Sequence, residues 1–403
     1  MTSLTDSHQS QYITDAAGLE RLCGRLRHSG RLALDTEFVG EDTFVPRLEL
    51  IQVATDEVAA AIDFPALHAQ GKLDCLWEVI CDPRIEKILH AGRQDLELFT
   101  TYAGQVPTPF FDTQIAAAMV GYGAQVAYAH LVQRLHGTKL AKSYTFTNWS
   151  QRPLTKEQLA YALEDVQFLL PIHDHLRSRL QKLGRHDWVH EEFSRLREAI
   201  ERRTEEPQDR YQRIRGWDNL KPRAAAVLRE LSAWREAEAR RRNIPRGRVV
   251  RDEVLLQLAR QAPKTLDELR SIRGLHSSEI ERSGETLLAL VRHALAQPPS
   301  AWPAVPRERK PEPESAGLVE LLQAVLRARA VEEDMAPTLL ATSADLQALA
   351  EAARRREYPD LPILRGWRRH LAGETLLGVL AGTIAVSVDP VTGALRLIPR
   401  DRS

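Results

Sequence analysis

The sequence has few cysteines and lacks any long apolar run, and both features exclude whole classes of protein. Its three cysteines, Cys23, Cys75 and Cys81, are odd in number and lack the Cys-x-x-Cys spacing of zinc and redox sites. They indicate reduced thiols, as in the cytoplasm, rather than a disulfide framework. No apolar stretch approaches the ~20 residues of a membrane-spanning helix. The polar residues 1–15 lack a signal-peptide pattern. We therefore expect a cytoplasmic protein that does not associate with a membrane.

The chain also lacks an excess of either charge: its net charge is zero, since 55 lysines and arginines balance 55 acidic residues. The total gives no support for nucleic-acid binding, but the distribution of charge does. Residues 210–251 hold thirteen lysines or arginines against four acidic residues. A solvated helix face is the alternative, but such a face usually carries balancing acids. We therefore predict a phosphate-binding surface. The densest part of this segment contains Arg240, Arg241, Arg242, Arg246 and Arg248.

Acidic side chains and one tyrosine occur in three short segments that share one chemistry. Asp35 and Glu37 end an apolar run that is typical of a buried strand, and two residues of separation put both on one face. Tyr161 and Asp165 lie one helical turn apart, and Asp95 belongs to a third segment. Buried carboxylates are costly unless cations neutralise them. Because Mg²⁺ and Mn²⁺ prefer oxygen ligands, the pattern predicts a divalent-cation site and hence an enzyme.

The order of these motifs resembles the DEDD superfamily of 3′–5′ exonucleases, in its tyrosine-containing branch. Within that branch the chain is most similar to the bacterial ribonuclease D family. D-x-E is followed by H-x4-D and Y-x3-D. Three longer segments also fit, namely LELIQVAT (48–55), FFDTQIAAAMVGYG (110–123) and NWSQRPLTKEQLAYALEDV (148–166). The resemblance implies a ribonuclease H-like α/β domain with the activity of a metal-dependent exonuclease.

The resemblance also implies a role for each motif residue. Two Mg²⁺ or Mn²⁺ ions would activate the attacking water and stabilise the leaving oxygen. Asp35 would bridge both ions, Glu37 and Asp165 would complete the first site, and Asp95 would serve the second through water. Tyr161 would orient or deprotonate the water. Its free pKa near ~10 makes it a weak base, so metal activation must supply most of the effect.

Three residues beside the motifs are candidate substrate contacts. His90 ends the predicted strand EKILH, where a hydrogen-bonded structural role and a contact to the terminal nucleotide stay equally open. Gln52 lies in a predicted strand beside the site, where we predict a sugar or phosphate contact. Arg152 precedes the helix of the third motif, and packing and phosphate contact compete there.

The first part of the chain predicts an α/β fold. Residues 10–28 have an amphipathic helical pattern, and helical patterns return from about residue 113. Strand-like runs lie between them, at 31–38, 48–55, 57–64, 86–91 and 107–113. The first three runs suit an antiparallel meander, and the whole suits a mixed sheet. Asp112 is predicted to cap a helix, and Thr155 with Gln158 to form a capping box.

The rest of the chain predicts two copies of one small helical domain. Pro245 and residues 272–274 recur at Pro337 and 364–366, at one offset of 92 positions, and GETLL recurs at 284–288 and 373–377. Both copies resemble the HRDC domain, which implies nucleic-acid binding, and the second is degenerate. The predicted boundaries are 1–200 for the exonuclease domain, 208–296 and 316–403 for the helical domains, and 297–315 for a proline-rich linker. A β-hairpin around Asp389 is expected within the last domain.

These features predict a 3′–5′ exoribonuclease that releases 5′-mononucleotides and trims structured RNAs, tRNA precursors above all, as the resemblance implies. RNA is the expected partner, and no obligatory protein partner is indicated. A DNA 3′–5′ exonuclease is the first alternative, because the same carboxylates serve it. Tandem HRDC-like copies without a Walker A loop argue against that alternative. An inactive nucleic-acid-binding scaffold is the second, but a scaffold need not retain buried like charges.

Overall fold

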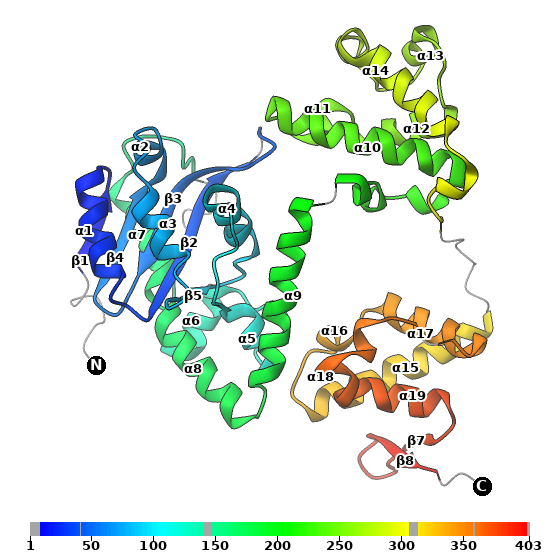
Figure 1. The fold of residues 1–403 in the computed structure, drawn as a ribbon. Coiled ribbons are helices and arrows are strands. Elements are labelled where there is room, and N and C mark those ends of the chain that lie inside the picture. Colours follow the sequence, from blue (N-terminus) through cyan, green and yellow to red (C-terminus); the bar gives the residue numbers. More distant parts are fainter. Residues whose placement is uncertain are drawn as a thin grey trace. The chain divides into compact units, whose positions relative to one another are not determined.

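A computed structural model describes most of the chain in two compact units. The described residues are 9–40, 42–140, 147–205, 207–305, 313–357 and 359–400. By their internal contacts, one unit comprises residues 1–37, 50–197 and 311–403, and the other comprises residues 38–49 and 198–310. Figure 1 traces both units, and each is described by itself. No helix in the described ranges has the length and apolar character needed to cross a bilayer.

A six-stranded mixed sheet forms the centre of the first domain (Figure 1). Its order is β1 (Gln9–Ile13), β4 (Val58–Asp63), β3 (Arg47–Ala54), β2 (Arg31–Val39), β5 (Glu86–Leu89) and β6 (Phe110–Asp112). β1 is parallel to β4, β3 is antiparallel to β4, and β5 is parallel to both β2 and β6. Strands β3 and β4 are buried almost throughout, as expected for strands covered on both faces. The predicted mixed sheet is confirmed.

The structure corrects the predicted helix over residues 10–28. Residues 9–13 form β1, and helix α1 (Ala16–Leu26) begins only after it. The Asp15 side chain caps α1 by accepting from the Gly18 N–H at 2.8 Å. The Tyr12 hydroxyl donates to Asp63 at the end of β4. Pairing with β4 therefore decides the conformation of a segment whose own pattern is ambiguous.

Helices surround the sheet of the first domain and begin earlier than residue 113. They are α2 (Phe64–His68), α3 (Asp74–Ile80), α4 (Arg93–Ala103), α5 (Thr113–Met119), α6 (Tyr128–His136), α7 (Lys156–Gln167), α8 (Leu169–Lys182) and α9 (His186–Glu205). Helix α7 packs against β4, and α8 packs against β5 and α5. The predicted capping box is confirmed at α7, where Thr155 and Gln158 each accept from the other's backbone N–H. Helix α9 continues past residue 200, the predicted end of this domain.

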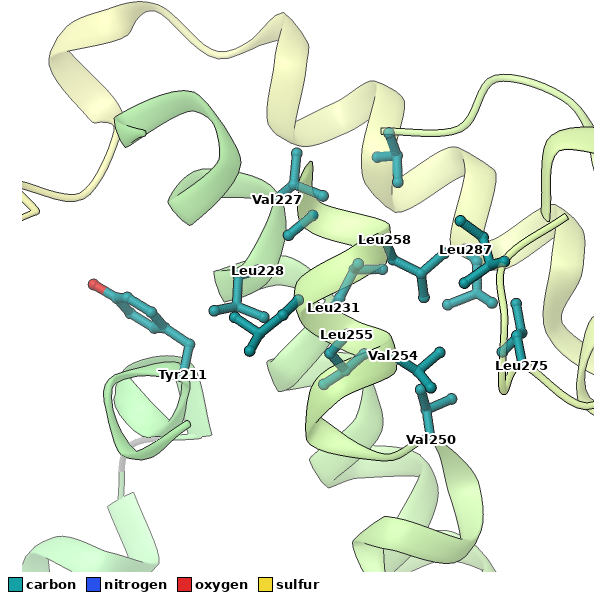
Figure 2. Packing of buried hydrophobic residues seen from close by; sticks show 14 of the residues in the cluster. Tyr211, Val227, Leu228, Leu231, Val250, Val254, Leu255, Leu258, Leu275 and Leu287 are labelled. Carbon is teal, nitrogen blue, oxygen red and sulfur yellow. The ribbon is translucent and has the colours of Figure 1, made fainter. Parts of the chain in front are cut away.

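The first helical domain folds around the long helix α10 (Pro222–Arg242). The other elements are 3₁₀ turns at Pro207–Arg213 and Trp217–Asn219, α11 (Arg246–Val249), α12 (Asp252–Gln261), α13 (Leu266–Arg270) and α14 (Ser277–Ala296). Figure 2 shows the core, in which Leu231, Leu255 and Leu287 are fully buried. Each such side chain stabilises the fold by about 1.5–3 kcal/mol. The core therefore joins α10, α12 and α14 into one small helical domain, as predicted.

The predicted linker is partly folded. A 3₁₀ turn spans Pro299–Ala301, and Arg229 donates from Nη1 to the Ala301 carbonyl at 3.2 Å. Val305 packs against the core of the first helical domain. Residues 306–312 lie outside the described residues, and helix α15 (Pro313–Glu332) starts inside the range predicted as linker.

The last domain resembles the first helical domain in its main helices, with a long first helix, a one-turn helix, a middle helix and a final helical segment, but a 3₁₀ turn takes the place of α13 and a hairpin follows the last helix. After α15 come α16 (Pro337–Leu340), α17 (Ser343–Arg355), a 3₁₀ turn at Pro362–Leu364, α18 (Gly366–Arg368), a π-helical turn at Arg369–Gly373 and α19 (Glu374–Leu380). Gly274 and Gly366, equivalent in the sequence repeat, both have positive φ, at 88° and 48°. Strands β7 (Ile384–Val388) and β8 (Leu395–Pro399) pair antiparallel, so the expected hairpin is confirmed. The assignment of this domain as a second HRDC-like copy remains a prediction.

Aromatic and charged side chains join the last domain to α9 within their common unit. The Trp188 and Trp367 rings stack with centroids 5.2 Å apart. Glu192 of α9 accepts from the Trp367 indole at 3.0 Å and from Arg368 Nη2 at 3.0 Å. Both partners of the Arg368–Glu192 pair are mostly buried, with side-chain exposures of 11% and 16%. Glu192 therefore serves two partners of the last domain at once.

Replacing Arg368 with methionine should loosen this interface. The change removes two charged hydrogen bonds to Glu192 and leaves the carboxylate largely buried, so we expect a loss of about 2 kcal/mol in the free energy of unfolding. Thermal and denaturant unfolding would measure it. The matched control is Arg369→Met, which removes a neighbouring arginine with 54% side-chain exposure. Equal stability of the two variants would show that Glu192 does not need its partner.

Candidate active site

Two carboxylates project from the later part of β2. Asp35 and Glu37 alternate with Thr36, so they share one face of the strand while Thr36 points to the other. Leu32 and Leu34 are fully buried and anchor the strand in the sheet. Asp35 and Glu37 are half-buried. The sequence therefore places charge where the apolar interior ends.

A third carboxylate comes from helix α7. Asp165 lies one turn after Tyr161, and the capping box fixes where this helix starts. Carboxylate oxygens of Asp35, Glu37 and Asp165 all lie within 4.8 Å of one another. Tyr161 is half-buried, with its ring centroid 6.3 Å from that of Trp149. The structure thus brings together three of the four acidic residues that the motifs predicted as ligands.

The fourth carboxylate, Asp95, approaches from the first turn of α4. Its side chain is buried and accepts a hydrogen bond from the Thr36 hydroxyl. The loop before α4 is held by Asp112, which accepts from the Gly92 N–H at 2.9 Å. Asp112 also accepts from the Gln114 N–H at 2.8 Å, so the predicted helix cap is confirmed. Thr36 and the second role of Asp112 were not predicted.

Burial and mutual repulsion favour the neutral, protonated form of these carboxyl groups. The pKa of Asp35 lies well above its usual range because of burial and the nearby charges of Asp95 and Asp165. Burial, with the charges of Asp165 and Asp95, raises the pKa of Glu37 to about 8. Burial is also the main cause that raises the pKa of Asp165 to about 7 and that of Asp95 to about 6. A cation among them would lower both the cost of burying the charged carboxylates and their mutual repulsion. The oxygen donors suit a hard divalent ion, so the residues fit the metal that the resemblance implies.

The same carboxyl groups predict how pH changes the stability of the metal-free protein. Their pKa values are higher in the folded than in the unfolded state, so the folded state binds more protons. Stability should therefore fall as pH rises from about 5 to about 8. Thermal unfolding in EDTA across this range tests the prediction. The Glu37→Gln variant, which cannot ionise at this position, should show a smaller fall. An equal fall in both proteins would assign the dependence to other groups.

Tyr128 is a further residue of the site that no motif marked. Its hydroxyl donates to the Glu164 carbonyl at 3.0 Å and accepts from the Phe168 N–H at 3.2 Å. These bonds tie α6 to the end of α7, next to Asp165. Burial, with the charges of Asp165 and Asp35, raises the pKa of Tyr128 well above its usual value. A buried tyrosine that satisfies backbone groups leaves no periodic signal in a sequence.

The three predicted substrate contacts near the site are held by other parts of the protein or are buried within it. His90 Nδ1 lies 2.9 Å from Thr113 Oγ1, and its Nε2 lies 3.0 Å from the Val126 carbonyl. Arg152 donates from Nε to Asp63 at 2.6 Å. For both residues these contacts favour the structural alternative. Gln52 is fully buried, so the structure leaves it no exposed surface for a sugar or phosphate, and its side chain has no hydrogen-bond partner within the described ranges.

The arginines of the first helical domain are more fully paired than their sequence suggests. Arg242 bonds Glu279 at 2.7 and 2.8 Å, and Arg246 bonds Glu236 at 2.5 and 2.7 Å. Arg241 bonds Glu238 at 2.8 Å, and Arg248 pairs with Asp42. The Arg240 guanidinium lies 5.5 Å from the Phe44 ring centroid. Glu236 and Glu279 are buried. Arg242 and Arg246 therefore form ion pairs with buried carboxylates, and their assignment as phosphate contacts stays a prediction.

The mixed sheet, with carboxylates on β2, α4 and α7, defines a 3′–5′ exonuclease domain of the DEDD type. A family described as 3'-5' exonuclease matches residues 10–181, and the HRDC domain family matches residues 224–291. This order of domains and the similarity to full-length relatives place the chain in the ribonuclease D family. Ribonuclease D of Granulibacter bethesdensis is 40% identical over 387 residues, covering 94% of each chain. Ribonuclease D of Acidiphilium cryptum is 39% identical over 379 residues, covering 93% of this chain and 94% of the relative.

A solved structure supports the same assignment. The chain is similar to the crystal structure of Escherichia coli RNase D, described as an exoribonuclease involved in structured RNA processing. The two are 34% identical with a TM-score of 0.79, over 93% of this chain and 99% of the other. The exonuclease fold implies the use of a divalent metal, which agrees with the donor set of the site.

Proposed function

We propose that this chain is a two-metal 3′–5′ exoribonuclease that removes 5′-mononucleotides one at a time from structured RNAs, tRNA precursors among them. One observation carries the proposal: carboxylate oxygens from β2 and α7 lie within 4.8 Å of one another. Membership of the ribonuclease D family supports RNA as the substrate. The DNA exonuclease alternative uses the same carboxylates but lacks this support.

Each side chain has a distinct part in the proposed hydrolysis. Asp35, Glu37 and Asp165 would hold the first divalent ion, and Asp35 with Asp95, the latter through water, would hold the second. Bound Mg²⁺ or Mn²⁺ would supply a nucleophilic water at neutral pH and stabilise charge on the phosphate and the leaving oxygen. The Tyr161 hydroxyl orients the attacking water beside Asp165. Thr36 keeps the Asp95 carboxylate in position through the hydrogen bond from its hydroxyl.

The helical domains serve to retain the RNA. In the first of them, the candidate phosphate contacts are Arg240, Arg241, Arg242, Arg246 and Arg248. A cavity of about 390 Å³ beside Arg246 is lined by further arginines, including Arg213 and Arg251. A tethered basic domain raises the concentration of substrate near the active site. We propose that the last domain is a second, degenerate HRDC-like copy, as the sequence repeat and the similar order of its main helices support.

The test is a hydrolysis assay with purified protein on a 3′-extended tRNA precursor and a matched single-stranded DNA. Each substrate is incubated with Mg²⁺, Mn²⁺ or EDTA. Stepwise release of 5′-mononucleotides from the RNA, abolished by EDTA, is the expected result. Faster hydrolysis of DNA would favour the DNA exonuclease. RNA binding without hydrolysis under any metal would leave the inactive scaffold.

A further inference from the structure

Cations that lack a carboxylate partner gather on the exonuclease domain at the ends of two helices. Arg134 lies in the last turn of α6, and Arg179 and Lys182 lie in the last turn of α8. All three are exposed, and the described part of the chain offers none of them an ion pair. The two helices are in contact. We call these three residues the α6–α8 basic surface. It differs from Arg242 and Arg246 of the first helical domain, each of which is paired with a buried carboxylate.

Aromatic side chains join the two helices at this surface. The Arg134 guanidinium lies 4.6 Å from the centroid of the Tyr122 ring, within range of a cation–π interaction. The Tyr122 hydroxyl lies 2.9 Å from His175 Nε2. His175 is one turn before Arg179 on α8, so Tyr122 links Arg134 to the cations of α8. The side chain of Arg134 is thereby partly fixed before any ligand arrives.

The pKa of His175 indicates an excess of positive charge at this surface. Its pKa is lowered by burial first and then by the charges of Arg179, His136 and Lys182, all of them basic. Stabilisation of the helix dipole is the simpler explanation for cations in a last turn, and it accounts for one cation on each helix. It does not account for Arg134, which contacts Tyr122, lying beside two further cations whose charges act on His175, the hydrogen-bond partner of Tyr122.

The position of the surface relative to the active site suggests its ligand. Helix α6 begins at Tyr128, whose hydroxyl bonds the end of α7 beside Asp165. Arg134 lies near the other end of this nine-residue helix, which is about 13 Å long. His136, also in its last turn, packs against Phe168, three residues after Asp165. A nucleic-acid strand with its 3′ end at the carboxylates can therefore reach the surface within a few nucleotides.

We propose that Arg134, Arg179 and Lys182 bind backbone phosphates of the RNA upstream of the nucleotide being removed. This inference rests on the proposed exoribonuclease function. Phosphate contacts of this kind add affinity without reading sequence, which suits an enzyme that removes successive nucleotides of any identity. Short substrates would not reach them, so the surface should matter for long RNA alone.

The test compares a triple variant, Arg134→Gln with Arg179→Gln and Lys182→Gln, with a matched control. The control is Arg27→Gln with Arg84→Gln and Arg177→Gln, which removes the same charge from exposed arginines that face Glu78, Asp82 and Glu86. Affinity for a long single-stranded RNA is measured in EDTA at several salt concentrations. Hydrolysis of a dinucleotide is measured with Mg²⁺, and thermal unfolding is measured for both proteins.

Loss of three phosphate contacts should weaken binding of the long RNA roughly fiftyfold at physiological salt and lower the salt slope by about 2. The control and the dinucleotide reaction should be unaffected, and a variant with lysine at Arg134 and Arg179 should keep its affinity. Equal RNA binding by the triple variant and the control would overturn the inference. A lower unfolding temperature without lost affinity would overturn it in favour of the helix-dipole role. Absent hydrolysis by the unmodified protein would instead refute the proposed function.

Discussion

The Asp35→Asn protein should hydrolyse RNA about a thousandfold more slowly than the unmodified protein while still binding RNA. The negative charges of Asp95, Asp165 and Glu37 all raise the pKa of Asp35, so Asp35 interacts with each of the other three carboxylates. As the residue proposed to bridge both ions, it supplies several kcal/mol of stabilisation that depends on metal, and each ~1.4 kcal/mol corresponds to a factor of ten in rate. Asparagine has a similar shape but no charge, so the fold should persist.

Single-turnover hydrolysis with saturating enzyme measures this effect without interference from binding. Glu164→Gln is the matched control, because it removes a neighbouring carboxylate of α7 that lies outside the group of three. RNA affinity in EDTA should be unchanged in both variants. Retention of more than about a tenth of the rate by Asp35→Asn would contradict the two-metal assignment, since less than ~1.4 kcal/mol would then depend on this carboxylate.

The Tyr161→Phe protein should lose about a hundredfold in kcat with little change in KM. Positioned proton-transfer and water-orienting groups typically contribute at least this much. Phenylalanine keeps the ring that lies near Trp149 and removes only the hydroxyl. Because the carboxylates are untouched, stabilisation of the protein by Mg²⁺ should be retained. A loss of kcat with intact metal binding would separate water orientation from metal binding.

The control for Tyr161 is Tyr102→Phe, which removes a half-buried hydroxyl from the far end of α4. Its ring is stacked near that of Trp77, with centroids 6.4 Å apart, and has no part in the site. Both kcat and Mg²⁺-dependent stabilisation should be unchanged there. A parallel loss of kcat and of Mg²⁺ stabilisation in Tyr161→Phe would instead show that the hydroxyl helps to hold the metal site together.

The acidic residues of the site could be predicted because their positions relative to apolar runs and to one another can be recognised in the sequence itself. Asp35 and Glu37 interrupt a buried strand, and a buried charge requires an explanation wherever it occurs. Tyr161 and Asp165 have helical spacing behind a capping box. Local rules of this kind also predicted the cap at Asp112 and the C-terminal hairpin, since caps and tight turns depend on neighbouring residues.

Features that depend on distant partners could not be predicted in the same way. Residues 9–13 form a strand because β4 lies beside them, which their own pattern does not reveal. Thr36 matters because α4 brings Asp95 to its hydroxyl, and Tyr128 matters because its hydroxyl meets the end of α7. The arginines of residues 210–251 outnumber the acids of their own segment, but Glu279, which lies outside it, pairs with Arg242.

The stacked indoles of Trp188 and Trp367 give the last domain an optical signature of its own. Two indoles in close, nearly parallel contact couple their electronic transitions, and their interplanar angle is 15°. Near-ultraviolet circular dichroism and fluorescence should therefore change when α9 and the last domain separate, before either unfolds. Separation of the last domain can then be followed in the unlabelled protein.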